Sequence, residues 1–304
     1  MFAFTNAAFT VDRVRGRGDF SLSQRQGEGA QAPSKPYLGG RIELFDFDLN
    51  PYITGQSPAP PPQQPDGDEP RPPAAASAPS AEIAAVRAPP RAVDVRADEA
   101  GPALDFSGLR ALDGDLEIVT HAVLVEHLRI DSARANIVIN DGYLAATVQD
   151  VRLYGGSGRG RFEIDARAPE VRIVQDFALS NLNAQRFLSD AFNYSAIEGR
   201  AELSINVPAT GRTADELVAS ADGRAHIEVV AGVLHGVDLG GVATTIRNAL
   251  RGELIAPEAR TPFNGFSATF AVSDGVLASN NLSFNTPDLR IVGLGVIDTN
   301  QRRL

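Results

Sequence analysis

The stretch that decides the fold is Ala135-Asn136-Ile137-Val138-Ile139-Asn140-Asp141-Gly142-Tyr143-Leu144, where polar and apolar residues largely alternate up to an Asp-Gly pair. A period of two places successive side chains on opposite faces of a β-strand, and Asp-Gly is a favoured hairpin turn. The alternation recurs in 161–165, 203–207 and 226–229. Further turns are expected at Asp113-Gly114, Glu198-Gly199, Asp222-Gly223 and Asp274-Gly275. The pattern predicts a mainly β protein: a long antiparallel, curled sheet, groove-like or solenoid-like, with a few short helices.

Three helices are expected to interrupt this sheet. Thr213 and Glu216 form a capping box that opens a helix to about Ala221. A second helix is expected over 239–251, ending at a glycine, and a third over 183–192. Asn50 and Asn183 each follow an Asp-Leu or Asn-Leu pair, where the side chain can cap a first helical turn.

The prolines divide the chain. Residues 56–102 hold 12 of the 20 prolines, and proline removes the backbone donors that a sheet or helix needs. We therefore predict a β-rich, truncated N-terminal segment of the sheet over 1–55, a disordered Pro/Ala-rich linker or loop over 56–102, and a β-rich domain over 103–304. An internal repeat with a spacing of 133 residues relates 141–144 to 274–277 and 160–165 to 293–298. Repeated units of this kind favour an elongated sheet.

The amino-acid composition excludes several classes of functional site. The 304 residues contain no cysteine or tryptophan, one lysine and four histidines, which excludes disulfides and cysteine-ligated metals. The net charge of −10 argues against binding to nucleic acid, which needs a basic footprint.

The remaining candidates for chemistry have simpler interpretations. The pairs His121/His127 and His226/His235 lack the spacing of metal ligands. Residues 155–160 are rich in glycine but are followed by a strand pattern, which favours a hairpin over a nucleotide loop. Carboxylate pairs such as Asp113 and Asp115 are the only candidate catalytic residues for a hydrolase. Their position in a solvated turn explains the presence of both acidic residues equally well. We expect no enzyme activity, no catalytic residues, no cofactor and no metal site.

The apolar faces of the strands are the best candidate for a site. They can form a core beneath the helices or the floor of a trough that holds acyl chains, and three helices are too few to cover ten or more strands. The candidate lipid-facing residues are Ile137, Ile139, Leu144, Phe162, Ile164, Leu203, Ile205, Ile227 and Val229.

The order of several short blocks resembles the C-terminal region of the AsmA family. The blocks are Leu104-Asp105-Phe106-Ser107-Gly108-Leu109, Asp141-Gly142-Tyr143-Leu144, Ile197-Glu198-Gly199-Arg200-Ala201, Ala231-Gly232-Val233-Leu234-His235-Gly236-Val237-Asp238-Leu239 and Phe266-Ser267-Ala268-Thr269-Phe270. The resemblance, which extends to the related TamB and YhdP group, implies a Gram-negative cell-envelope protein with a periplasmic β-rich body. It further implies an inner-membrane anchor that this sequence lacks, and no catalytic residues.

What such a protein does is also implied by the resemblance. The family is linked to phospholipid transport between the inner and outer membranes, to outer-membrane assembly and to the regulation of protein targeting. The expected partners are phospholipid or another acyl lipid, a membrane reached through the missing anchor, and other envelope proteins. The alternative is a structural or adhesive β-module that binds protein partners along its edges.

Overall fold

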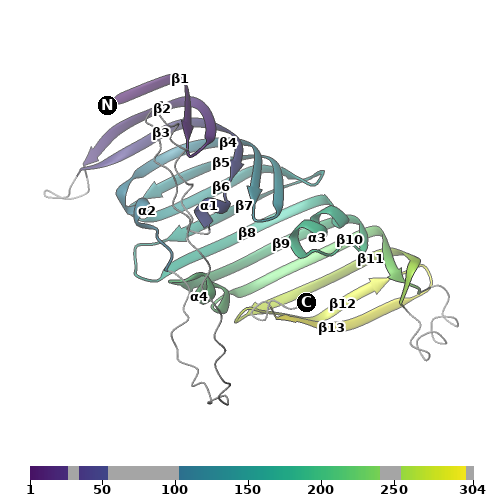
Figure 1. Ribbon diagram of the computed structural model, residues 1–304. Coiled ribbons are helices and arrows are strands. Elements are labelled where there is room, and N and C mark those ends of the chain that lie inside the picture. The colour runs from purple at the N-terminus through teal and green to yellow at the C-terminus, as the bar shows by residue number, and fades with distance from the viewer. Residues whose placement is uncertain (27–33, 54–102, 240–254, 299–304) are drawn as a thin grey trace, which may run out of the picture.

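The computed structural model describes residues 1–26, 34–53, 103–239 and 255–298, and Figure 1 shows one sheet running through all four ranges. The strands are β1 Phe2–Val11, β2 Val14–Gln26, β3 Ser34–Asp48, β4 Asp113–Val125, β5 Leu128–Asn140, β6 Tyr143–Leu153, β7 Gly156–Asp165, β8 Val171–Asn183, β9 Ile197–Gly211, β10 Asp222–Val237, β11 Ile255–Ser273, β12 Val276–Asn285 and β13 Arg290–Asp298. The helices are α1 Asn50–Ile53, α2 Ser107–Ala111, α3 Ala184–Phe192 and α4 Ala214–Ala219. The predicted linker, 56–102, lies outside the described residues.

The thirteen strands are ordered in space as in the sequence, which confirms the predicted long, mainly β sheet. The expectation of a wholly antiparallel sheet is wrong at one pair. Strands β3 and β4 run parallel, with Leu38 opposite Gly114 and Leu44 opposite Thr120. Parallel neighbours need a crossover of about a dozen residues or more, and residues 49–112, which separate the two strands, supply that length.

Two of the five predicted turns are hairpin turns in the structure. Asp141-Gly142 joins β5 to β6 and Asp274-Gly275 joins β11 to β12, each with positive φ at both residues. The turn predictions at 113–114, 198–199 and 222–223 are wrong, because these residues lie within strands. A side chain at Gly114 would place its Cβ 2.7 Å from the Leu38 carbonyl oxygen, and at Gly223 the same atom would lie 2.1 Å from the Asn206 oxygen. These glycines allow close approach of neighbouring backbones rather than a change of direction.

The helix caps follow the sequence closely. The Asn183 side chain accepts a hydrogen bond from the Arg186 amide at 3.0 Å, and the Thr213 hydroxyl accepts one from Glu216 at 3.1 Å. Helices α3 and α4 are therefore confirmed, whereas most of the predicted helix over 239–251 lies outside the described residues. Asn50 is the first residue of α1, and its side-chain amide donates at 3.2 Å to the Glu126 carbonyl in the β4–β5 turn; its role as a cap stays a prediction.

The internal repeat corresponds to two hairpins of the same register. Tyr143 pairs with Asp165 across β6 and β7, and Val276, the equivalent of Tyr143, pairs with Asp298 across β12 and β13. Each hairpin contains one bulge after its first few pairs. The 133-residue spacing therefore marks a repeated supersecondary unit.

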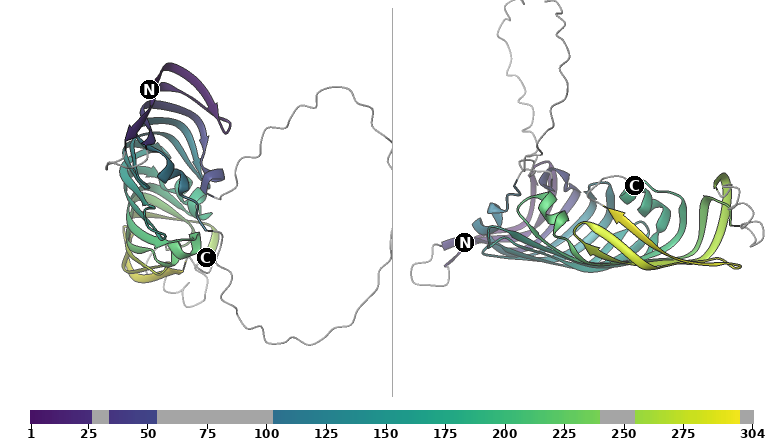
Figure 2. Two further views of the ribbon diagram at one scale, coloured as in Figure 1. Left: turned by 90° about the vertical axis from the view of Figure 1, so that its left-hand side faces the viewer. Right: turned by 90° about the horizontal axis from the view of Figure 1, so that it is seen from below.

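Bulges bend the sheet into a trough. Register shifts occur in eight of the twelve strand pairs, and several bulges contain a residue with positive φ, such as Asn181 in β8 and Ala231 in β10. A bulge bends its strand and increases the local twist. Figure 2 shows the curved sheet from the side, with the helices on its concave face.

A cluster of buried hydrophobic residues lies where α3 meets the concave face. Phe187 and Leu188 of α3 pack in one cluster with Leu182 and Val229, both 0% exposed. The hydroxyl of Tyr154 completes the cluster at its edge: it donates to the Asp190 carboxylate at 2.8 Å and accepts from the Arg129 amide at 3.0 Å. This end of the trough is a conventional dry core.

Replacing Leu182 with alanine is expected to lower the free energy of unfolding by about 2–5 kcal/mol, because it leaves a cavity in this cluster. Val218→Ala on α4, where the side chain is 41% exposed, is the matched control and should change it by about 0.5 kcal/mol or less. Urea unfolding followed by circular dichroism measures both. Equal effects of the two substitutions would contradict this assignment of the core.

Candidate functional site

Cross-strand register places all nine predicted residues on the concave face. Two rows run from β5 through β6 to β7: Ile137–Ala146–Phe162 and Ile139–Leu144–Ile164. Three pairs join β9 to β10: Leu203–Ile227, Ile205–Ala225 and Ala201–Val229. Strand β8 connects the two groups, because Phe177 lies opposite Gly160 of β7 and opposite Ile205 of β9. The nine side chains are thus parts of one apolar floor.

The nine residues differ in how far they are covered. Val229 is 0% exposed and belongs to the core beneath α3, so the core interpretation holds for this residue. Leu203 and Ile227 are half-buried and pack against the edge of the same cluster. The remaining six are half-buried outside it. Their role in binding lipid stays a prediction.

The helices cover the ends of the strands and leave the centre of the floor between them. Along β9, α3 packs near Ala201, and α4 packs on Gly211, where a Cβ would lie 2.7 Å from Glu216. The ten steps along the strand from Ala201 to Gly211 span roughly 34 Å, and Ile205 lies near the middle. Among the described elements, Figure 2 shows no helix over the sheet between these two. The floor is therefore an apolar surface with walls at its ends.

The sequence reasoning missed several members of the floor. Ile173 and Phe177 of β8 and Phe270 of β11 are half-buried and lie on the same face as Ile205. Their alternation was available in the sequence, since Ile173, Gln175, Phe177 and Leu179 are spaced by two. Gln175 interrupts the apolar pattern, which weakened the signal.

The convex face carries ion pairs, some between neighbouring strands and some within one strand. Glu43 of β3 accepts hydrogen bonds from Arg17 at 2.6 Å and pairs with His121 at 2.9 Å. These two hydrogen bonds, the one from Arg17 foremost, lower the pKa of the Glu43 carboxyl. On β7, Arg161 lies 2.5 Å from Glu163. The two faces of the sheet therefore present opposite surfaces to the solvent.

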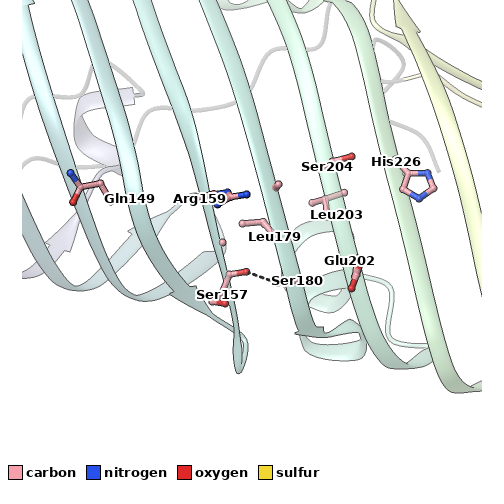
Figure 3. Close-up of a pocket in the computed structure, with 11 residues that line it drawn as sticks. Gln149, Ser157, Arg159, Leu179, Ser180, Glu202, Leu203, Ser204 and His226 are labelled. Atoms are coloured by element: carbon pink, nitrogen blue, oxygen red, sulfur yellow. Dashed lines mark hydrogen bonds between the residues drawn. The ribbon is translucent and has the colours of Figure 1, made fainter.

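A hollow of about 410 Å³ lies on the convex face, and Figure 3 shows its lining. Arg159, Glu202, Ser204 and His226 contribute side chains to it from β7, β9 and β10. The His226 ring forms a hydrogen bond with the Thr269 hydroxyl, with 2.9 Å between Nδ1 and Oγ1. This hollow is on the wrong side of the sheet to extend the apolar floor.

The other candidates for chemistry have structural roles. Tyr154 and Gly155 form the β6–β7 hairpin turn, so the predicted hairpin is confirmed, but the rest of the glycine-rich stretch begins strand β7. Asp113 is buried and accepts a hydrogen bond from the Asp141 amide at 2.9 Å, and Asp115 accepts one from Asn136 at 3.1 Å. In the described ranges, no group of three or more histidine, cysteine or acidic residues is arranged to hold a metal ion.

Comparison with known proteins identifies the family. The sequence model of the AsmA family matches residues 74–282, which is most of the chain. The chain belongs to the AsmA family. No curated protein and no solved structure matches it. AsmA-family proteins are associated with the cell envelope, and the family is generally non-enzymatic. Among the helices that the structure describes, none has the length and apolar character needed to cross a bilayer.

In this AsmA-family protein an ion pair lies at the end of β7, near α2. Arg167 donates to the Asp165 carboxylate at 2.6 Å, and this hydrogen bond lowers the pKa of Asp165 to about 2. Next to the pair, Arg110 of α2 donates to the Ala166 carbonyl at 2.9 Å. The pair therefore holds the chain where α2 meets the end of β7.

Asp165→Asn is expected to destabilise the protein slightly at pH 7, by less than about 1 kcal/mol because the pair is at the surface. The folded pKa lies below the unfolded value, so the stabilisation is present above the unfolded pKa and is lost as the pH falls toward 2. The gap between the melting temperatures of wild type and variant should therefore close between pH 5 and pH 2. A gap that stays constant over this range would contradict the assignment.

Proposed function

We propose that the apolar floor binds the acyl chains of phospholipid or of another acyl lipid, and that the protein handles such lipid between the inner and outer membranes. One observation carries the proposal: Ile137, Phe162 and Ile205 lie in continuous apolar rows that are half-buried between the helix-covered ends. A large, uncovered apolar surface on a folded protein marks a binding site.

The dimensions of the floor suit this ligand. Neighbouring strands lie about 4.8 Å apart, so the floor from β5 to β10 spans roughly 24 Å. Acyl chains of one leaflet occupy about half of the roughly 30 Å hydrocarbon core of a bilayer. An acyl chain can therefore lie along the floor, across the strands, with its headgroup in water.

The energies favour binding without any chemical step. Removing one methylene from water contributes about 0.8 kcal/mol, so ten methylenes on the floor contribute roughly 8 kcal/mol before the cost of ordering the chain. In the part of the chain that the structure describes, no helix covers the centre of the trough, which would allow a chain to enter and leave sideways. Contact of this kind suits transport better than storage.

In the same proposal the protein works in the periplasm, anchored to the inner membrane by a segment outside this sequence. Delivery of phospholipid would support outer-membrane assembly and, through it, protein targeting. Family membership and the apolar floor support this proposal. The second candidate function, capture of protein partners along a sheet edge, is favoured by the exposed apolar strand β13.

Replacing Ile205 with aspartate is expected to weaken the binding of phospholipid with a fluorescent acyl chain by roughly tenfold or more, because a charge removes at least two methylene contacts of about 0.8 kcal/mol each. Phe162→Asp should act in the same way at the other half of the floor. The dissociation constants are measured by fluorescence titration of the purified proteins.

Ser204→Asp is the matched control, since Ser204 is the neighbour of Ile205 in β9 and faces the convex side. It carries the same new charge and should bind as the wild type does. Equal losses in both variants, or wild-type protein that binds no phospholipid, would count against the proposal.

A further inference from the structure

A hollow of about 1120 Å³ lies at the α3 end of the trough, between the β4–β5 turn and the carboxyl-terminal half of α3. The β4–β5 side contributes Glu126, His127 and Arg129, and the helix side contributes Asp190 and Phe192. Pockets for small molecules typically measure roughly 300–1,000 Å³, so the hollow has room for a lipid headgroup. Strand β5, which begins at the hollow, also carries part of the apolar floor.

The hollow contains charged groups of both signs that do not neutralise one another. Arg129 and His127 can carry a positive charge, whereas Glu126 and Asp190 are carboxylates. Among the described residues, neither basic side chain forms an ion pair or a hydrogen bond with either carboxylate. The Asp190 carboxylate accepts one hydrogen bond, from the neutral Tyr154 hydroxyl at 2.8 Å, and a carboxylate can accept several. Both signs of charge therefore remain available to a ligand.

The end of α3 adds to the negative charge of this hollow. The carboxyl end of a helix carries a negative partial charge and favours a cation, and the last turn of α3 contains no basic residue. A primary ammonium fits this environment, because its three N–H donors match the carboxylate oxygens of Glu126 and Asp190. A phosphodiester fits Arg129, since a guanidinium offers paired donors to phosphate oxygens. A group with both charges would satisfy the whole hollow.

We propose that this hollow binds the headgroup of a phospholipid that carries a phosphodiester and a primary ammonium, as phosphatidylethanolamine does. Arg129 and His127 hold the phosphate, and Glu126 and Asp190 hold the ammonium. The proposal rests on the proposed function, since it takes the ligand of the floor to be a phospholipid, and it adds which headgroup is selected. A glycerol headgroup keeps the phosphate but leaves both carboxylates without a cation, so the hollow discriminates against it.

The test compares two phospholipids with the same fluorescent acyl chain, one with an ethanolamine headgroup and one with a glycerol headgroup. Each is titrated into the purified full chain, and the ratio of the two dissociation constants is measured. The wild type is expected to bind the ethanolamine lipid about tenfold more tightly, the factor expected for one hydrogen bond to a charged group.

Glu126→Gln/Asp190→Asn is expected to bring this ratio close to one, because it removes both partners of the ammonium. The amide oxygen introduced at Asp190 can still accept the Tyr154 hydrogen bond, and melting curves check that the variant folds. Glu202→Gln/Glu228→Gln is the matched control: it makes the same change of charge at two exposed residues that lie opposite each other on the convex face, and it should keep the full preference.

Arg129→Gln is expected to weaken the binding of both lipids by similar factors, because both carry the phosphate. The Arg129 backbone amide, which donates to the Tyr154 hydroxyl at 3.0 Å, is unchanged in this variant. Arg159→Gln, at an exposed residue of the convex face, is its control and should bind both lipids as the wild type does.

Equal binding of the two lipids by the wild type, or a full preference in Glu126→Gln/Asp190→Asn, would overturn the headgroup proposal and leave the floor proposal standing. A wild type that binds neither lipid contradicts the proposed function instead. Soluble glycerophosphoethanolamine, which has the headgroup without acyl chains, then decides the role of the hollow by calorimetric titration. Binding by the wild type that is lost in Glu126→Gln/Asp190→Asn supports the headgroup site, and no binding by the wild type overturns it.

Discussion

The structure depends on one constraint, the cross-strand register that keeps apolar side chains on a single face of the sheet. Side chains alternate with a period of two, so a slip of one residue would move a whole row of the floor to the convex side. The bulges respect this constraint. In β8 the bulge at Asn181 allows Leu179 and Leu182, three residues apart, to reach the same face, opposite Leu203 and Ala201. The sheet therefore bends without interrupting its apolar surface.

The two faces of the sheet have different roles. The cluster beneath α3 is the hydrophobic core in the described part of the chain, and hydrogen bonds between neighbouring strands hold the rest of the sheet. The ion pairs on the convex face are largely exposed, and screening by solvent makes such pairs contribute little to stability. Their main effect is to keep that face in water. The concave face has apolar side chains that the described helices do not cover. It is therefore suited to contact with an apolar ligand.

The sequence predicted what depends on local pattern and missed what depends on distant neighbours. The alternation around Ile137 identified the floor, and Asn183 and Thr213 identified two helix starts, because side-chain period and capping are local. The parallel pairing of β3 with β4 and the close-approach role of Gly223 depend on strands far away in the sequence. For the same reason the pattern could not separate Val229, which is buried beneath α3, from Ile205, which is half-buried outside that cluster.

The central claim is that the concave face, and only this face, meets acyl chains. The chain has no cysteine of its own, so single cysteines can be placed in turn at residues 202–207 of β9 and labelled with a fluorophore. Quenching by phospholipid with a nitroxide on its acyl chain then reports contact at each position. The account predicts strong quenching at 203, 205 and 207 and weak quenching at 202, 204 and 206. Quenching without this alternation, or stronger on the even-numbered positions, would contradict it.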